Sequence, residues 1–265
     1  MKRARFSKGH GRGMIDTDFQ GKVVLVTGAA QGIGAAIAQA FKEAGAIPWL
    51  ADIDQQGVEA AARTIDGAWT ALDLSNTDAT NAMVRDVLAN HERIDVLVHA
   101  AGGVRGQVGK PVEDVSFEEW RAIFAANVDA AFCLARAVAP AMKRRGRGRI
   151  VTISSGAGLR PSLTGIQAYA AAKHALVGLT RQLSHELGPH GITVNSIAPG
   201  LVLSNPTTQK QWDSYSSDVQ DEIIAHTHTR RLGEAGDIAA AALYFASDSA
   251  GWVSGQVLSV DGGRD

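Results

Sequence analysis

Seven short apolar segments recur along the 265-residue chain, and longer segments with helical periodicity separate them. The expected strands are 22–27, 48–53, 69–74, 95–100, 149–154, 192–197 and 256–260, and the expected helices are 33–44, 55–64, 77–90, 116–145, 167–187 and 237–247. Apolar strands that alternate with crossover helices are typical of a parallel sheet covered on both faces. The pattern predicts an α/β fold with a doubly wound, seven-stranded parallel sheet, whose ligand crevice lies beyond the carboxyl ends of the strands.

The segment before the first strand, residues 1–18, is predicted to be a disordered extension. It is basic and rich in glycine, and it has no apolar stretch of the kind that a signal peptide contains. Met14 offers a second start for translation, which would make 1–13 an upstream extension. Residues 19–265 are predicted to form a single domain, because no repeat or low-complexity linker divides them.

The charge balance and the cysteine content narrow the partners and the compartment. With 26 Lys and Arg against 27 Asp and Glu, the chain has no basic field for nucleic acid or for an anionic membrane. The single cysteine, Cys133, cannot form an intrachain disulfide, which favours a reducing compartment, the cytoplasm. Asn127, Asp129 and Arg136 interrupt the apolar stretch 122–142, so we expect a buried or interface helix and no membrane span.

A glycine-rich turn, TGAAQGIG (27–34), follows the first expected strand. Gly28, Gly32 and Gly34 let the backbone turn tightly and approach a pyrophosphate at the amino end of the next helix. A strand before the turn and a helix after it are the context of a Rossmann-type dinucleotide site. Asp52 ends the second expected strand, 18 residues after Gly34, where an acid accepts hydrogen bonds from the adenosine ribose.

The acidic residues after the second and third strands bear on the choice of cofactor. A carboxylate at Asp52 repels the 2′-phosphate of NADP, and no arginine directly follows the glycine turn or Asp52, so we expect NAD. Asp52 can alternatively cap the helix near Gln55, a role that Asp54 fills equally well. Asp73 can contact the adenine edge or cap the helix near Asn76.

Tyr169 and Lys173 stand four residues apart in the alanine-rich helical segment AYAAAKHAL (168–176). That spacing places both side chains on one face of the helix. The order and spacing of these and other motifs resemble those of the short-chain dehydrogenase/reductase family, and the similarity covers nearly all of 21–263. The motifs are TGAAQGIG (27–34), HAAG (99–102), ISS (153–155), YAAAK (169–173), APG (198–200) and GQVLSVDGG (255–263).

The resemblance implies a catalytic tetrad of Asn127, Ser155, Tyr169 and Lys173, with Ser154 as the alternative serine. Because a free tyrosine has a pKa near ~10, its phenolate needs a nearby cation, which Lys173 supplies. Ser155 would bind the substrate oxygen, and Asn127 would hold a water in a proton path from Lys173. The implied cofactor contacts are Gly28, Gln31, Gly32, Ile33, Gly34, Asp52, Asp73, Leu74, Ala100, Gly102, Tyr169, Lys173, Pro199, Gly200, Val202 and Ser204.

Two positions depart from the family pattern. His99 stands where asparagine is common, and we expect it to donate a hydrogen bond to a backbone carbonyl of a neighbouring strand, in preference to acting as a second catalytic base. Ser204 replaces the usual threonine but keeps the hydroxyl for the nicotinamide carboxamide, and Val202 would pack near the nicotinamide ring.

Two segments are expected to cover the substrate: the loop 102–114, which carries Arg105, and a lid at 201–231. The expected substrate contacts are Ser155, Arg160, Gln167, Tyr169 and Arg264. Arg264 would clamp a carboxylate in a neighbouring subunit's site, or would be a frayed terminal charge. No metal site is expected, since His226 and His228 in the lid lack a carboxylate cluster.

The resemblance implies a homotetrameric oxidoreductase. Asp52 favours NAD, and the polar residues Arg105, Arg160, Gln167, His226 and His228 favour a small polar substrate. The enzyme would interconvert a secondary alcohol and a ketone on a sugar, sugar acid or polyol. One alternative is a 3-oxoacyl-thioester (acyl carrier protein) reductase, which would use NADPH. The alternative of another class is a dinucleotide-sensing protein without catalysis.

Overall fold

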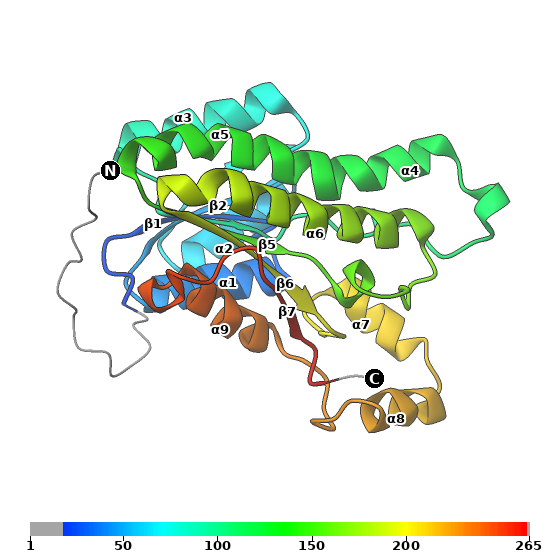
Figure 1. The fold of residues 1–265 in the computed structure, drawn as a ribbon. Helices are drawn as coiled ribbons and strands as arrows, with labels where there is room; N and C mark the ends of the chain where they lie inside the picture. Colours follow the sequence, from blue (N-terminus) through cyan, green and yellow to red (C-terminus); the bar gives the residue numbers. More distant parts are fainter. Residues whose placement is uncertain (1–17, 264–265) are drawn as a thin grey trace, which may run out of the picture.

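The computed structural model describes residues 18–263 and contains the expected parallel sheet (Figure 1). The strand order is β3-β2-β1-β4-β5-β6-β7, and every neighbouring pair is parallel. This order confirms the doubly wound, seven-stranded sheet. The strands are β1 (Val23–Thr27), β2 (Ile47–Asp52), β3 (Ala68–Ala71), β4 (Val96–His99), β5 (Gly148–Ile153), β6 (Ile192–Pro199) and β7 (Val257–Val260). The predicted extension 1–18 lies outside the described residues except for Asp18, as do Met14 and Arg264.

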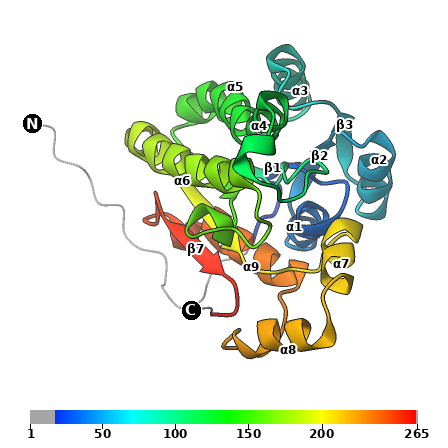
Figure 2. The same ribbon diagram turned by 90° about the vertical axis from the view of Figure 1, so that its right-hand side faces the viewer.

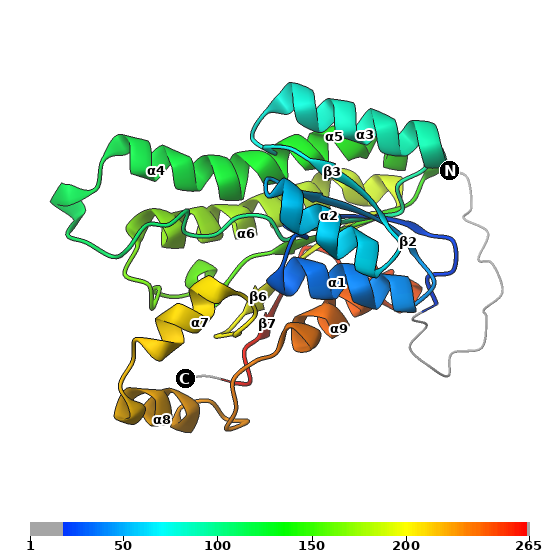
Figure 3. The same cartoon turned by 180° about the vertical axis from the view of Figure 1, so that it is seen from behind.

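Helices cover both faces of the sheet (Figures 1 and 2). One face carries α1 (Gly32–Glu43), α2 (Gln55–Thr64) and α9 (Ala235–Ala246). The other face carries α3 (Thr77–His91), α4 (Phe117–Phe124), α5 (Ala130–Arg145) and α6 (Gln167–Leu187). Two shorter helices, α7 (Pro206–Asp213) and α8 (Ser217–Ala225), project beyond the sheet edge and are clearest from behind (Figure 3).

Strand β1 illustrates how sequence alternation divides the core. Val24 and Val26 pack into the cluster beneath α1 and α9, whereas Val23 and Leu25 pack into the cluster beneath α3 and α5. Successive side chains of a strand point to opposite faces, and all four are at most 1% exposed. A strand that is apolar at every position is therefore buried between two helical layers.

The expected helix 116–145 is interrupted in the structure by a π-helical turn, Ala125–Asp129, between α4 and α5. Such a turn frees backbone carbonyls from the regular ladder, and the Asn127 side chain takes up one of them, the Ile123 oxygen, at 2.8 Å. The combined stretch Phe117–Arg145 passes a length and composition test for a membrane span, which core helices of soluble proteins also pass.

The lid segment 201–231 contains the helices α7 and α8, which the sequence analysis did not anticipate. Each helix has its own capping side chain. Asn205 accepts hydrogen bonds from the Thr207 and Thr208 amides, and Ser216 accepts one from the Val219 amide. No residue of either helix is buried, so this segment adds little to the core.

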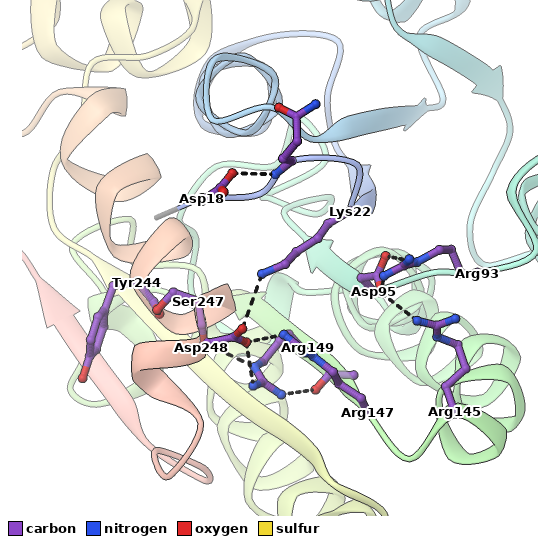
Figure 4. A network of polar contacts seen from close by, with 12 residues as sticks. Asp18, Lys22, Arg93, Asp95, Arg145, Arg147, Arg149, Tyr244, Ser247 and Asp248 are labelled. Carbon is purple, nitrogen blue, oxygen red and sulfur yellow. Dashed lines mark hydrogen bonds and ion pairs between the residues drawn. The ribbon is translucent and has the colours of Figure 1, made fainter. Parts of the chain in front are cut away.

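A network of ion pairs lies at the amino-terminal end of the sheet, opposite the crevice (Figure 4). Asp248, which follows α9, pairs with Lys22 before β1, with Arg147 before β5 and with Arg149 in β5. A hydrogen bond from Arg147 and the surrounding cations lower the pKa of Asp248, although partial burial opposes this shift. The basic residues around 143–149 thus belong to the end of the molecule remote from the crevice.

Candidate active site

The glycine-rich turn links β1 to α1 in a conformation that requires glycine. Gly28 and Gly32 have φ angles of +67° and +61°, in the left-handed region. A Cβ on Gly28 would lie 2.5 Å from the Ala101 amide nitrogen, and one on Gly34 would lie 2.0 Å from the Gly28 carbonyl oxygen. The turn therefore packs so closely against Ala101 and against its own backbone that neither position has room for a side chain.

A cleft of about 560 Å³ opens beside this turn, at the carboxyl ends of β1 to β4. Four small residues of α4, of the π-helical turn and of α5 form one wall: Ala122, Ala125, Ala126 and Ala130. The predicted cofactor contacts that line the cleft are Gly28, Gln31, Ile33, Gly34, Asp52, Asp73, Leu74, Ala100, Gly102 and Ser204. Those that do not line it are Gly32, Tyr169, Lys173, Pro199, Gly200 and Val202.

Two of the residues that do not line the cleft, Val202 and Gly32, have contacts elsewhere in the protein. Val202 is 5% exposed, forms a bridge with Gly233 and packs into the core beside α9. Its contact with a nicotinamide ring stays a prediction. Gly32 lies against the lid, since a Cβ there would be 3.1 Å from the Ser204 carbonyl oxygen. Ser204 thus joins the lid to the glycine turn.

Asp52 is held rigidly at the end of β2. One carboxylate oxygen accepts a hydrogen bond from the Ala30 amide in the glycine turn at 3.0 Å, and the other accepts one from the Asp54 amide at 3.1 Å. Asp54 is the residue that caps α2, because its side chain accepts from the Gly57 amide. Of the two readings of Asp52, capping therefore falls to Asp54, and Asp52 lines the cleft.

Asp73 also faces the cleft instead of capping a helix. Asn76 caps α3 through the amides of Asp78 and Ala79. Asp73 Oδ1 accepts from both the hydroxyl and the amide of Ser75. The hydrogen bonds from Ser75 lower the pKa of Asp73 against an opposing effect of burial, and the positive charge of Arg105 adds a lesser lowering effect.

The two candidate serines after β5 have different partners. The Ser154 hydroxyl is 3% exposed and donates to the Lys173 carbonyl oxygen in α6 at 3.2 Å. Ser155 accepts a hydrogen bond from the Ala157 amide at 3.1 Å and is hydrogen-bonded to Tyr169. The structure thus pairs Ser155 with the tyrosine and leaves Ser154 as a strut between β5 and α6.

Tyr169 and Lys173 lie together on the inner face of α6. The Lys173 ammonium is 5.7 Å from the Tyr169 ring centroid and donates to the Ile153 carbonyl oxygen at 3.0 Å. Burial raises the pKa of Tyr169, and the hydrogen bond with Ser155 partly opposes this. Burial lowers the pKa of Lys173 to about 8, since its side chain is only 4% exposed. Three of the four residues of the predicted tetrad, Ser155, Tyr169 and Lys173, therefore lie together between β5 and α6.

Asn127, the fourth tetrad residue, is fully buried beside the loop that follows β4. Its amide group donates to the carbonyl oxygens of Ile123 and Gly103, and its Oδ1 accepts from the Gly103 amide at 3.0 Å. Both amide hydrogens are thus engaged by protein. At the Asn127 side chain, only the second lone pair of Oδ1 remains for a water. That Asn127 holds such a water stays a prediction.

His99 ends β4 close to this region and is 1% exposed. Its Nδ1 lies 3.0 Å from the Thr27 hydroxyl, so the expectation of a backbone carbonyl partner is wrong. Its Nε2 has no hydrogen-bond partner within residues 18–263. Burial, with a contribution from the Lys173 charge, lowers the pKa of His99 to about 3, so the imidazole is neutral at physiological pH.

The predicted substrate residues have partners within the protein. Arg160 pairs with Asp261 after β7 at 3.1 Å. The Gln167 amide donates to the Lys110 carbonyl oxygen at 2.8 Å and so ties the loop 102–114 to the start of α6. Arg264 is outside the described residues.

Arg105, expected among the polar contacts of the substrate, lines the cleft together with Asp52 and Asp73, whereas Tyr169 does not line it. In the sequence, the only sign of an unusual position is that Gly102 and Gly103 precede Arg105 and Gly106 follows it. No group of three His, Cys, Asp or Glu side chains suited to a metal ion occurs within 18–263.

Comparisons with known proteins agree with this geometry. A family model described as "Enoyl-(Acyl carrier protein) reductase" matches residues 28–265. The chain is 37% identical over 256 residues to the D-threitol dehydrogenase of Mycolicibacterium smegmatis, covering 94% of this chain and 95% of that protein. It is 36% identical over 249 residues to the 3-oxoacyl-(acyl-carrier-protein) reductase of Escherichia coli, covering 93% of this chain and 98% of that protein.

A solved structure has the same architecture. A short-chain type dehydrogenase/reductase from Mycobacterium ulcerans superimposes with a TM-score of 0.86 and 32% identity, covering 93% of this chain and 90% of that one. With the family match and the relatives, this likeness establishes both the fold and the class of reaction. The chain belongs to the short-chain dehydrogenase/reductase family, whose members are oxidoreductases that act on CH–OH groups.

Proposed function

We propose that the protein is an NAD-dependent oxidoreductase that interconverts a secondary alcohol and a ketone on a small polar substrate, a sugar, sugar acid or polyol. The observation that carries the cofactor choice is the fixed carboxylate of Asp52, which the Ala30 and Asp54 amides hold in the cleft. A carboxylate at this place accepts from ribose hydroxyls and repels a 2′-phosphate. The likeness to D-threitol dehydrogenase supports a polyol-sized substrate.

The residues present fit a nicotinamide dinucleotide. Gly28 and Gly34 let the turn pack tightly against the neighbouring backbone and line the cleft, and the amino end of α1 favours the negative charge of a pyrophosphate. Asp52 and Asp73 would hold the adenosine, and Lys173 would hold the nicotinamide ribose. A bound nicotinamide would supply or accept the hydride.

The chain's own residues would handle the proton. Burial raises the pKa of Tyr169, which keeps the phenol neutral and able to give a proton to a carbonyl oxygen. In the reverse direction Tyr169 would take the proton, and the nearby Lys173 ammonium would stabilise the phenolate. Ser155, hydrogen-bonded to Tyr169, would share the substrate oxygen and stabilise the charge that develops on it.

The second candidate is a 3-oxoacyl-thioester reductase that uses NADPH, which the likeness to the Escherichia coli enzyme favours. Two features weigh against it. Asp52 disfavours a 2′-phosphate, and the basic residues 143–149 that an acidic carrier protein would need lie at the opposite end of the sheet, around Asp95 and Asp248. A dinucleotide-sensing protein without catalysis is the third reading, and the close grouping of Ser155, Tyr169 and Lys173 weighs against that one.

We also propose a homotetramer in the cytoplasm. Phe117 and Phe132, on α4 and α5, are 79% and 50% exposed, which is unusual for side chains of this size and suits burial against another subunit. The near-neutral net charge of −1 and the single cysteine are consistent with a cytoplasmic protein.

The test is a panel of sugars, sugar acids, polyols and 3-oxoacyl thioesters, assayed with NAD(H) and NADP(H) in both directions. We expect turnover of a polar alcohol with a strong preference for NAD. Tyr169→Phe should lower turnover at least about a hundredfold while NADH binding is retained. Comparable efficiency with NADP would overturn the cofactor proposal, and NADH binding without turnover of any panel member would favour the sensing protein.

A further inference from the structure

Arg105 occupies an unusual backbone conformation beside the cofactor cleft. Its φ angle is +53°, in the left-handed region that bulky side chains rarely adopt. Its neighbours Gly102, Gly103 and Gly106 also have positive φ angles. Glycine would adopt such a conformation at Arg105 without strain, so an arginine here is explained better by its side chain than by the turn itself.

The charged residues that line the cleft show why the positive charge of Arg105 matters there. Among the described residues of the lining, Asp52, Asp54 and Asp73 carry negative charge, and Arg105 alone carries positive charge. A dinucleotide with a charged pyrophosphate would enter a cleft that carries three carboxylates. The guanidinium of Arg105 offsets part of that repulsion.

The position of Arg105 identifies which end of the cleft it serves. The charge of Arg105 acts on Asp73, which follows β3. Ser155, which follows β5, and Tyr169, which lies in α6, do not line this cleft. In the described part of the chain no ion pair fixes the Arg105 guanidinium. It therefore remains available to a ligand at the Asp73 end of the cleft.

We infer that Arg105 holds the adenosine half of the dinucleotide by closing its planar guanidinium over the adenine ring, an inference that rests on the proposed cofactor binding. Guanidinium groups stack on planar aromatic rings as well as pairing with anions. Asp73 would contact the adenine edge while Arg105 covers its face. Arg105 would thus act on cofactor retention and would leave the reacting end of the cofactor unaffected.

The test measures the binding of three nucleotides to the purified full-length chain by calorimetry or fluorescence titration. The probes are NADH, NADPH and reduced nicotinamide mononucleotide, which lacks the adenosine half. The variants are Arg105→Ala and Arg105→Asn, the second of which accepts a left-handed backbone readily and so preserves the loop. The matched control is Arg121→Ala, an exposed arginine of α4 that does not line the cleft.

We expect both Arg105 variants to weaken NADH binding about three- to tenfold, the range for loss of a guanidinium from an aromatic face. Binding of the mononucleotide should not change, and Arg121→Ala should bind all probes as the wild type does. Unchanged NADH affinity, an equal loss for the mononucleotide, or a loss confined to NADPH would each overturn the inference. Wild-type protein that binds no NADH would overturn the proposed function itself.

Discussion

At the scale of single residues, burial decides the protonation of the site. Lys173 and His99 are both basic and both less than 5% exposed, and the pKa of each is lowered, to about 8 and about 3 respectively. His99 therefore stays neutral and leaves Lys173 as the cation beside Tyr169. A second buried cation here would repel the Lys173 ammonium and disfavour its charged form.

The lowered pKa of Lys173 predicts a pH-dependent cost in stability. Below a pH of about 8 the folded protein holds a buried ammonium, and as the pH rises towards the unfolded value of 10.5 the folded state binds fewer protons than the unfolded state. Stability from this group therefore increases with pH over that window. Relative to Lys173→Met, the wild-type free energy of unfolding should rise by about 2 kcal/mol from about pH 7 to about pH 10.

Denaturant unfolding at several pH values measures this difference. Lys210→Met, which removes an exposed lysine of α7, is the control and should give a difference that does not vary with pH. A flat difference for Lys173→Met as well would mean that the lysine is solvated in the folded state.

At the scale of elements, the glycine turn and α1 form one unit with Asp52. The Ala30 amide binds the Asp52 carboxylate, and Gly34 lies against the Gly28 carbonyl. The position of the carboxylate that would select the cofactor therefore depends on how closely α1 approaches the turn.

Gly34→Ala should push α1 away from the glycine turn. Its Cβ would lie 2.0 Å from a backbone oxygen, so α1 must shift or the turn must open, although alanine itself favours a helix. We expect NADH affinity to fall more than about tenfold and the midpoint of thermal unfolding to decrease. Gly236→Ala in α9 is the control, because a Cβ there meets no atom within 4 Å. Retained affinity in Gly34→Ala would show that the turn tolerates expansion.

At the scale of the whole molecule, the two ends of the sheet carry different kinds of residues. The carboxyl ends carry the cleft and the tyrosine, whereas the amino ends carry the ion pairs around Asp95 and Asp248. Asp248 joins parts of the chain that are far apart in sequence, β1 through Lys22 and β5 through Arg149. Burial of Arg149, together with the nearby charge of Arg147, lowers the pKa of Arg149, so this guanidinium depends on its acidic partner.

Asp248→Asn should therefore destabilise the fold without changing cofactor binding. We expect the free energy of unfolding to fall by about 1 kcal/mol at low salt. The value is modest because the Asp248 side chain is 45% exposed, and the difference should become smaller as salt is added. Thermal or denaturant unfolding at two salt concentrations measures it. Asp66→Asn is the control, because Asp66 is fully exposed where it pairs with Lys42. An equal effect in both variants would argue against a special role for Asp248.

The sequence predicted most of the framework because its signals are local. All seven strands and all six expected helical regions lie where the periodicity indicated, within a few residues. Three features were not predicted: the π-helical turn inside 116–145, and the helices α7 and α8 in the lid. The sequence of α7 is polar apart from Trp212, and α8 has only nine residues, so neither gives the extended helical periodicity of the longer helices.

The sequence by itself determined the alternation of strands and helices, the glycine turn and the four-residue spacing of Tyr169 and Lys173. These depend on the period of a strand or a helix, which neighbouring residues encode. Only the tertiary structure decided that Ser155 pairs with Tyr169 while Ser154 binds the Lys173 carbonyl, and that Arg105 lies in the cofactor cleft. Those outcomes depend on contacts between strands and loops distant in sequence, which no local period specifies.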